Sequence, residues 1–407
     1  MKNKPALSLI FLTVFIDLLG FGLLIPILPT FATKVLHVDE LAIGIAIAIY
    51  SLVQFFFNPI FGELSDKHGR KPMIVISLFI NAIGYVIFAF TSSFLLLIIS
   101  RIVAGVGGSS IGVAQAYIAD ITTKENRSKG MGLIGAAFGL GFVFGPLIGG
   151  LLSKYGYMVT GFASGGFSIL AFVLTLLLLP ESLKQKNKQI RKRKLFDVNS
   201  FKKVFSKPLL AILVVLFFIL TFSVANIYGT FALLGYKIYG FTDLQNGYMY
   251  GIIGLMSAIV QGGLLNYISK YVNDKKLIIF GSLFMIVGLG LMPYGGSFFW
   301  LAIIVTVLSF GTGTLQPTLL SMISKVTSES EQGVTLGINQ SLSAFARMLG
   351  PLWGGFAFEF LGYQFPFLTG ALFTLLILLI SIFYLPKILR GDEKLLINEI
   401  KEPANLD

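Results

Sequence analysis

The feature that most constrains this chain is a succession of long apolar runs separated by short polar segments. A helix needs about 20 mainly apolar residues to cross the hydrocarbon core of a membrane. Of all residues 55% are hydrophobic and only 12% are charged, whereas a soluble domain carries about 25% charged residues. Lipid is therefore the expected environment. The predicted spans, twelve in all, are residues 7–30, 41–62, 73–92, 94–118, 130–153, 159–180, 209–234, 245–269, 275–294, 297–321, 333–358 and 363–386.

The basic residues predict which side of the membrane each connecting segment faces, because cytoplasmic segments are enriched in Lys and Arg. With both termini in the cytoplasm, 26 of the 31 basic residues fall in cytoplasmic segments. Lys34, Lys154 and Lys237 fall in external segments, and Arg101 and Arg347 lie inside spans. We therefore expect an all-α membrane protein with twelve transmembrane helices and both termini cytoplasmic. Because the charges form short clusters between apolar runs, the net charge of +12 does not indicate nucleic acid as a partner.

Two pairs of similar segments indicate that the chain has two related halves. Gly-Pro-Leu-Ile-Gly-Gly at 145–150 recurs as Gly-Pro-Leu-Trp-Gly-Gly at 350–355, and Leu-Pro-Glu at 179–181 recurs as Leu-Pro-Lys at 385–387. Such repeats predict two six-helix bundles with a substrate cavity between them near mid-membrane. The predicted parts are an N-terminal bundle at 1–180, a basic cytoplasmic linker at 181–207, a C-terminal bundle at 208–390 and a cytoplasmic tail at 391–407. The linker either tethers the halves or also binds anionic membrane lipid.

Four motifs resemble those of the major facilitator superfamily. The segment after the second span resembles its signature loop, and the fourth span is similar to its Arg-x3-Gly-x-Gly-Gly motif, with Arg101 first. The fifth span resembles the motif of antiporter branches, and the first span that of twelve-helix drug:proton antiporters, with Asp17 in it. The loop residues are Gly62, Asp66, Gly69, Arg70 and Lys71, and the antiporter residues are Gly141, Gly145, Pro146, Gly149 and Gly150.

The end of the fourth span, residues 117–122, is similar to the tetracycline-efflux proteins. This chain departs from them in its membrane acids. No acidic residue occurs between Asp66 and Asp120, or between Asp274 and Glu329. These gaps cover the third and ninth spans, where tetracycline exporters carry acids. The resemblance therefore implies drug efflux but argues against tetracycline itself.

Asp17 and Arg101 are the candidate proton-coupling residues. Both lie near mid-depth of their spans, where a charge costs about 2.5–3.5 kcal/mol even on the most lenient insertion scale. At 1.5 Å per residue the two lie at similar depths, and we hypothesise that they face one another in the N-terminal bundle. Asp17 would then carry the proton, with Arg101 setting how tightly it is held. The alternative is a permanent ion pair that only fixes helix packing.

The signature loop is expected to act as a conformational latch. Gly62 would permit close approach of a neighbouring helix, and Asp66 would reach charged groups across the cytoplasmic face between the bundles. Such a latch would favour an outward-open state. Asp120 and Arg127, at the next cytoplasmic turn, would form a charge relay with Asp66 and Arg70; the alternative is an ordinary solvated loop.

Four polar residues at membrane depth are candidates for substrate binding: Gln54, Asn226, Gln340 and Arg347. The alternative for Arg347 is a side chain that reaches a lipid headgroup or a backbone carbonyl. The glycines of the fifth span also serve helix packing. His37 and His68 both lie in connecting segments and Cys is absent, so no metal site, cofactor or enzymatic centre is expected, and the proton is the coupling ion.

The function expected from the resemblance is proton-coupled export of an amphipathic or cationic small molecule by alternating access, in which protonation of Asp17 opposes substrate binding. The alternative is a proton-linked carrier of a specific metabolite or glycolipid, which a cluster of cavity arginines would favour. A membrane scaffold without transport would have no need to bury Asp17. We expect a functional monomer in the bacterial inner membrane.

Overall fold

Helices form all the regular secondary structure in the residues that the computed structural model of the protein describes, which are 4–122, 127–183, 198–327 and 331–385. The first part comprises α1 (Lys4–Leu24), α2 (Leu28–Lys34), α3 (Glu40–His68), α4 (Arg70–Ala89), α5 (Phe94–Gly107), α6 (Ser110–Ile121), α7 (Arg127–Leu152), η2 (Ser153–Tyr155) and α8 (Tyr157–Leu178). The second part comprises α9 (Val198–Phe205), α10 (Pro208–Leu233), η3 (Leu234–Ile238), α11 (Asp243–Ile259), η4 (Val260–Leu264), α12 (Leu265–Ile268), α13 (Asp274–Leu291), η5 (Met292–Tyr294), α14 (Phe298–Lys325), α15 (Gln332–Phe356), η6 (Ala357–Leu361) and α16 (Phe365–Phe383).

Within these described residues, ten helical segments are long and apolar enough to cross a membrane. They coincide with ten of the twelve predicted spans. The other two predicted spans, 245–269 and 333–358, are also helical and form α11 with its continuation to Ile268, and α15. These two are more polar, with Asn246, Gln340 and Arg347 among their residues. Because α11 packs on α7 and α15 packs on α3, part of their circumference faces protein and need not be apolar.

Polar residues at the turns set where several helices begin. The side chains of Asp39, Asn273 and Ser297 accept hydrogen bonds from backbone N–H groups in the first turns of α3, α13 and α14. Thr242 and Gln245 form a reciprocal capping box at the start of α11. These side chains satisfy N–H groups that have no partner within the helix. Apolar runs therefore start as helices directly after a polar turn.

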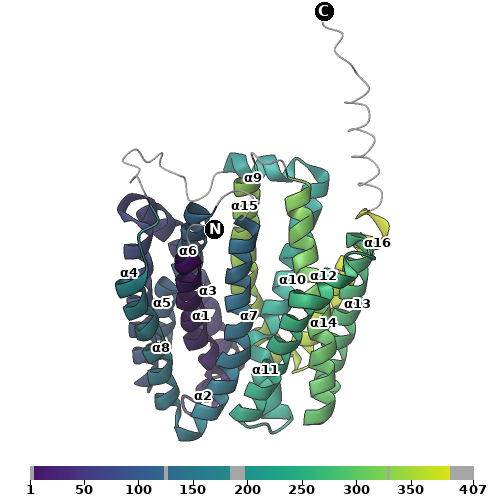
Figure 1. The fold of residues 1–407 in the computed structure, drawn as a ribbon. Coiled ribbons are helices and arrows are strands. Elements are labelled where there is room, and N and C mark those ends of the chain that lie inside the picture. The colour runs from purple at the N-terminus through teal and green to yellow at the C-terminus, as the bar shows by residue number, and fades with distance from the viewer. Residues whose placement is uncertain (1–3, 123–126, 184–197, 328–330, 386–407) are drawn as a thin grey trace, which may run out of the picture.

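The helices of residues 4–178 pack mainly against one another, and those of residues 208–383 do the same. The two sets repeat the same pairings: α1 contacts α7 and α8 as α10 contacts α15 and α16, and α4 contacts α5 and α8 as α13 contacts α14 and α16. Figure 1 shows the two sets side by side. The pairs α3–α15 and α7–α11 join the sets. We call the region between these four helices the seam.

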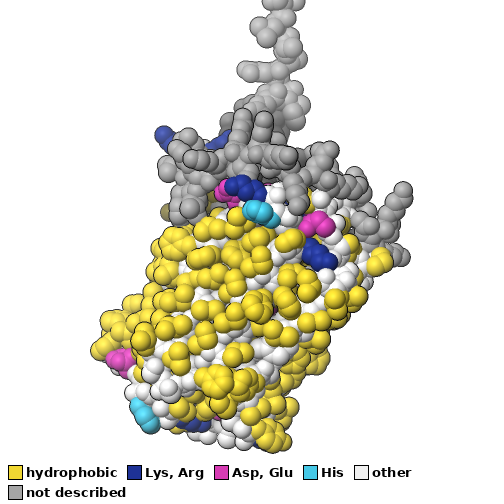
Figure 2. Space-filling model, turned by 90° about the vertical axis from the view of Figure 1, so that its left-hand side faces the viewer, with side chains coloured by type: hydrophobic (Ala, Val, Ile, Leu, Met, Phe, Trp, Pro, Cys, Tyr) yellow, Lys and Arg dark blue, Asp and Glu magenta, His cyan; other side chains and the backbone are white. Residues whose placement is uncertain are grey.

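The molecule has an apolar middle and two polar ends. Figure 2 shows hydrophobic side chains over the middle of one face and charged side chains near both ends. The short helix α9 lies at one end, which we call the linker end, and α2 lies at the opposite end, which we call the far end (Figure 1). Exposed side chains of the middle include Leu170, Phe280 and Leu372. An apolar middle between polar ends suits a lipid bilayer.

Candidate functional site

Asp17 lies on α1 in the interior of the first set of helices, and only 5% of its surface is exposed. Its carboxylate accepts three hydrogen bonds. Asn81 of α4 donates at 2.7 Å, Ser168 of α8 at 3.1 Å, and Ser110 of α6 at 3.3 Å. All three donors are neutral. A carboxyl group held in this way can gain or lose a proton without leaving a buried cation unpaired.

Arg101 of α5 is also buried, but it does not pair with Asp17. Its Nη2 donates to Ser100 Oγ at 3.2 Å, its guanidinium lies 5.5 Å from the centre of the Phe88 ring, and its Nε has no hydrogen-bond partner in the described part of the chain. The hypothesis of a facing Asp17–Arg101 pair is therefore wrong for this structure. The two residues do share a neighbour, because Tyr50 lies close enough to both for their charges to act on its phenol group. Asp17 and Arg101 nevertheless have different direct hydrogen-bond partners.

Tyr50 connects this interior to the seam. It lies on α3, stacks on Phe21 of α1 with ring centres 5.2 Å apart, and accepts a 3.1 Å hydrogen bond from Gln54. Gln54 also donates to the Gly108 carbonyl at 2.9 Å. The Phe142 ring of α7 lies 6.1 Å from Phe21. One side of the seam is thus aromatic, with polar groups of Tyr50 and Gln54 that remain partly accessible.

The predicted latch is a network within the first set of helices. Arg70 is 2.6 Å from Asp66 and 3.0 Å from Asp120, and it donates to Ser65 Oγ at 2.6 Å. The sequence missed a further member, Glu181, whose carboxylate accepts the backbone N–H of Arg70 at 2.9 Å. Glu181 is the acid of the repeated Leu-Pro-Glu segment, for which the sequence had indicated no contact. The network ties α3, α4 and α6 to the segment after α8.

The remaining latch residues differ in what they contribute. Lys71 donates its backbone N–H to Glu181 at 3.2 Å. Gly69 has φ +113° and lies against the Glu181 carboxylate, a conformation that side chains with a Cβ rarely adopt. Among the described residues, Gly62 has no atom within 4 Å of the place a Cβ would take, so they show no close helix approach at this glycine. The Arg127 side chain is not among those that the structure describes. In this arrangement the ion pair of Asp66 is with Arg70, so its reach across to the other half stays a prediction for the outward-open state.

The glycines of the antiporter-like segment pack α7 on two neighbours at once. A Cβ on Gly141 would meet Leu18, and one on Gly145 would meet Gly22 at 2.7 Å, both on α1. Gly149 likewise lies against Leu23 of α1. Gly150 faces the other way, where its Cβ would lie 2.8 Å from the carbonyl of Asp243 on α11. The Pro146 carbonyl completes this second face, because Gly247 of α11 packs directly against it.

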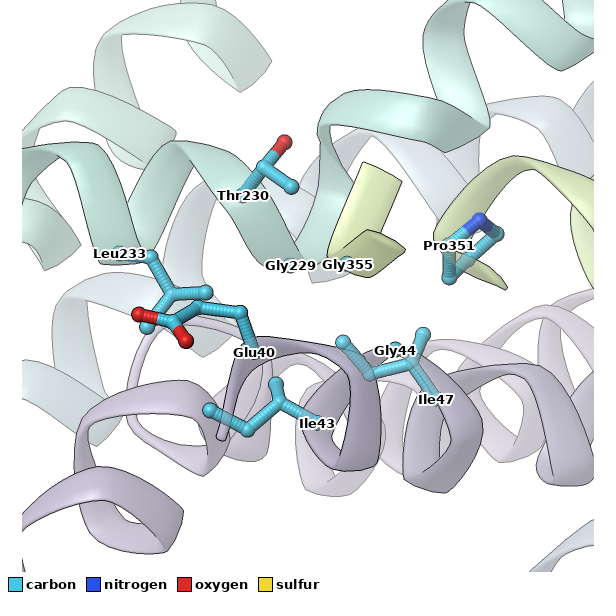
Figure 3. Close-up of a pocket in the computed structure, with 9 residues that line it drawn as sticks. All are labelled: Glu40, Ile43, Gly44, Ile47, Gly229, Thr230, Leu233, Pro351 and Gly355. Atoms are coloured by element: carbon cyan, nitrogen blue, oxygen red, sulfur yellow. The ribbon is translucent and has the colours of Figure 1, made fainter. Parts of the chain in front are cut away.

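The repeated segment in α15 makes the equivalent contacts. Gly350 and Gly354 pack on Asn226 of α10, while Gly355 packs on Glu40 of α3. Gly44 of α3 packs against the Pro351 carbonyl, just as Gly247 packs against Pro146. Figure 3 shows Gly44 and Ile47 of α3 facing Pro351, Gly355 and Gly229 across a small pocket. Small residues thus bring both seam pairs into close contact.

Charged and polar side chains join the two sets at the far end. Asp243 of α11 accepts a hydrogen bond from Tyr157 of α8 at 2.9 Å and lies 4.0 Å from Lys34. Lys237 pairs with Glu40, and Glu359 of η6 accepts the backbone N–H of Leu41 at 2.9 Å. From the sequence, Lys34 and Lys237 had been considered only for predicting which side of the membrane their segments face. Together with the glycine contacts, these bonds close the seam at the far end.

The four candidate substrate residues occupy different places. Asn226 is fully buried and donates to the Pro366 carbonyl, so it is a packing residue and the prediction of a substrate contact is wrong for it here. Gln340 is exposed on α15. Gln54 and Arg347 are partly accessible at the seam. Tyr228 of α10, which sequence reasoning did not select, interacts electrostatically with Arg347.

Comparison with known proteins identifies the family to which this architecture belongs. The family model of the Major Facilitator Superfamily matches residues 10–292 and 263–399. The chain is 32% identical to tetracycline resistance protein, class C, of Escherichia coli, over 86% of this chain and 89% of that protein. It is 30% identical to multidrug resistance protein 1 of Bacillus subtilis (strain 168), over 90% of this chain and 94% of that protein. Among solved structures, the human organic anion transporter MFSD10 (TETRAN) superposes with a TM-score of 0.71 and 25% identity, covering 93% of this chain and 99% of that one.

The family match covers most of the chain, and the fold, the apolar helices and the repeated seam contacts agree with it. The expected drug:proton antiporter branch is also supported, by relatives named for tetracycline and multidrug resistance. The chain is a multi-pass membrane protein that belongs to the major facilitator superfamily, and it is a secondary transporter of small molecules rather than an enzyme.

Proposed function

We propose that this protein exports an amphipathic small molecule in exchange for protons, and that Asp17 carries the proton. The observation that carries the proposal is the Asp17 carboxyl, buried and bonded to three neutral donors. A charge at membrane depth is costly and marks a functional site. The names of the two resistance proteins to which the chain is similar support a drug as the exported molecule.

The architecture proposed for this function has twelve spans, with α11 and α15 added to the ten strongly apolar segments. They form an N-terminal bundle at 1–180 and a C-terminal bundle at 208–390, joined by the linker 181–207 and followed by the tail 391–407. The basic residues put the linker end and both termini in the cytoplasm. By analogy with its bacterial relatives, the membrane is the bacterial inner membrane, with membrane lipid around a functional monomer.

Alternating access is the proposed mechanism, with the two bundles rocking about the seam. The bonds of Asp243, Lys237 and Glu359 across the far end support an arrangement closed to the outside. At the linker end, Arg70 holds Asp66 and Asp120 within its own bundle. Opening to the outside would release the far-end bonds and bring the two linker-end surfaces together. Protonation of Asp17 and binding of substrate would favour different states, one closed to the outside and the other open to it.

Reconstituted proteoliposomes test the proposal. We expect at least one amphipathic compound to induce proton release coupled to its uptake, and Asp17→Asn to abolish this coupling. Glu63→Gln is the matched control, because the one ion pair of Glu63 within the described residues is an exposed contact with Lys67 at 3.6 Å. The proton assignment fails if the Asp17→Asn variant still moves substrate when a pH gradient is imposed.

The second candidate function is a carrier of a specific metabolite or glycolipid. One observation favours it: Arg101 and Arg347 have no carboxylate partner within 4.0 Å among the described residues. The 25% identical human protein is named an organic anion transporter, which points in the same direction. The two candidates separate in the same assay, because a specific carrier responds to one chemical class and a drug exporter to several.

A further inference from the structure

Arg347 is a cation at membrane depth without a counterion. It lies well inside α15, 15 residues after the helix begins at Gln332. No acidic side chain lies within 4.0 Å of it in the part of the chain that the structure describes. An unpaired charge at such depth is costly, and packing alone does not account for it. The side chain also remains partly accessible, so a ligand can reach it.

The register of α15 turns Arg347 toward the seam. Residues three and four apart lie on the same face of a helix. Arg347 precedes Gly350, which packs on α10, by three residues, and precedes Pro351, which packs on Gly44 of α3, by four. Arg347 therefore lies on the face of α15 that meets both α3 and α10, about one turn nearer to the linker end than the tight glycine contacts.

Tyr50 of α3 lies at nearly the same depth. Gly44 and Pro351 are in contact and mark one level. From that level Tyr50 is six residues along α3 and Arg347 is four residues along α15, both toward the linker end. At about 1.5 Å per residue these steps differ by about 3 Å. Arg347 lies close enough to Tyr50 and to Tyr228 of α10 for its charge to act on both phenol groups. Three helices thus present a guanidinium and two phenol groups to one region.

The fixed charges of this region do not balance. Away from the ends of the described spans, the charged residues are Asp17, Arg101 and Arg347. They comprise two cations and one carboxyl group, and that carboxyl is held by Asn81, Ser110 and Ser168 rather than by an arginine. The excess is positive whether or not Asp17 is protonated. A bound monoanion would remove the excess when Asp17 is ionised and reduce it when Asp17 is protonated.

We propose that Arg347, assisted by the hydroxyl groups of Tyr228 and Tyr50, binds an anionic group of the transported molecule. A guanidinium presents donors in a fork that matches a carboxylate, and each phenol can add an O–H donor. The apolar part of the molecule would rest on the aromatic side of the seam, formed by Phe21 and Phe142. The substrate class is therefore an amphipathic aromatic anion. This inference rests on the transport function proposed above.

The test uses aromatic scaffolds, each in three forms: a carboxylic acid, a primary alcohol and a primary amine. Purified protein in phosphatidylcholine vesicles is assayed for compound-induced proton flux, with protein-free vesicles subtracted. Direct binding is measured in detergent from the rise in Tm. We expect the acid forms to have an apparent KM about 10- to 100-fold lower than the alcohols, as charged hydrogen bonds allow.

Four variants report on the site. Arg347→Gln should bring the acid-to-alcohol ratio close to one, and Arg347→Lys should keep part of it. Tyr228→Phe should lower the ratio a few fold, because one donor is lost. Tyr294→Phe is the control, since Tyr294 is 60% exposed at the far end. Size-exclusion profiles confirm that each variant is folded.

The outcomes separate the two proposals. If Arg347→Gln keeps the wild-type preference, or if the amine forms are favoured, the anion site is refuted while export stands. If no compound moves protons, the proposed function fails, and the binding measurement still decides the site, because acids must raise the Tm of wild type more than that of Arg347→Gln. If phosphatidylglycerol suppresses acid transport by wild type and raises the Tm of wild type but not that of Arg347→Gln, the occupant is a lipid headgroup and the small-molecule assignment is wrong.

Discussion

Adding a single methyl group to either seam glycine should open the far end of the transporter. A Cβ on Gly247 would lie 2.6 Å from the Pro146 carbonyl oxygen, and a Cβ on Gly44 would collide with that of Pro351. Both obstacles are backbone atoms in helices, which cannot move aside as a flexible side chain can. Overpacking of this kind costs about 1–3 kcal/mol. The cost falls on the arrangement closed at the far end, so the ratio of open to closed molecules should rise by about 5- to 150-fold.

The chain contains no cysteine, so one introduced cysteine reports on the opening without background. Ile47 is suitable because it lies three residues after Gly44 on α3, toward the linker end, and packs on Gly229 (Figure 3). Ile47→Cys is labelled in cells with a membrane-impermeant maleimide. In the closed arrangement the reaction should be slow, and adding Gly44→Ala or Gly247→Ala should accelerate it by a factor in the range given above. The two variants should act similarly because their contacts are equivalent.

Gly62→Ala is the matched control. It lies on α3, like Gly44, but no atom of the described residues lies within 4 Å of the place its Cβ would take. The double variant Ile47→Cys with Gly62→Ala should be labelled at the same rate as Ile47→Cys alone. If Gly62→Ala accelerates labelling as much as Gly44→Ala, or if neither seam variant changes the rate, then the glycine contacts do not hold the far end closed and the reasoning fails.

Two further changes test the polar networks at opposite ends. Asp243→Asn should accelerate labelling of the same cysteine by about 3- to 10-fold, because a charged partner of Tyr157 and Lys34 becomes neutral; an unchanged rate would show that the far-end bonds contribute nothing to closure. Glu181→Gln should lower the Tm of the purified protein by about 2 °C, since an exposed carboxylate that ties α8 to α4 is worth about 1 kcal/mol, whereas Glu63→Gln should leave the Tm unchanged.

The seam contacts were accessible from the sequence because they depend on residue size. A helix can approach another closely only where a small residue lies between them. The recurrence of Gly-Pro and Gly-Gly after 205 residues therefore predicted two equivalent segments. The structure gives them equivalent neighbours, one helix in the same half and one in the other half. The apolar runs were accessible for a similar reason, since length and polarity determine what can cross a bilayer.

The sequence could not show whether Asp17 and Arg101 pair, because the depth of a residue in the membrane does not reveal which neighbouring helix its side chain points toward. Each residue turns a helix by about 100°, and the span that contains Arg101 is interrupted between α5 and α6 at residues 108–109. Ser110, just after the interruption, is the residue that reaches Asp17. Glu181 and the far-end charges were missed for another reason. Their partners lie more than 80 residues away in the chain, and a polar loop gives no indication of which distant turn it contacts.

The two halves share a scaffold but not their chemistry, and this difference constrains coupling. Arg347 lies three residues before Gly350, and the equivalent place before Gly145 is occupied by Phe142. Asp17 lies five residues before Gly22, which packs on Gly145, and the equivalent place before Asn226 is Thr221, whose hydroxyl donates to its own helix. The buried carboxyl thus belongs to the first half and the unpaired guanidinium of the seam to the second. A direct electrostatic interaction between the two sites would make protonation of Asp17 favour a bound anion, which is the opposite of exchange. Exchange of an anion for a proton therefore requires that the two sites communicate through the relative position of the halves, with each ligand favouring a different closure of the seam.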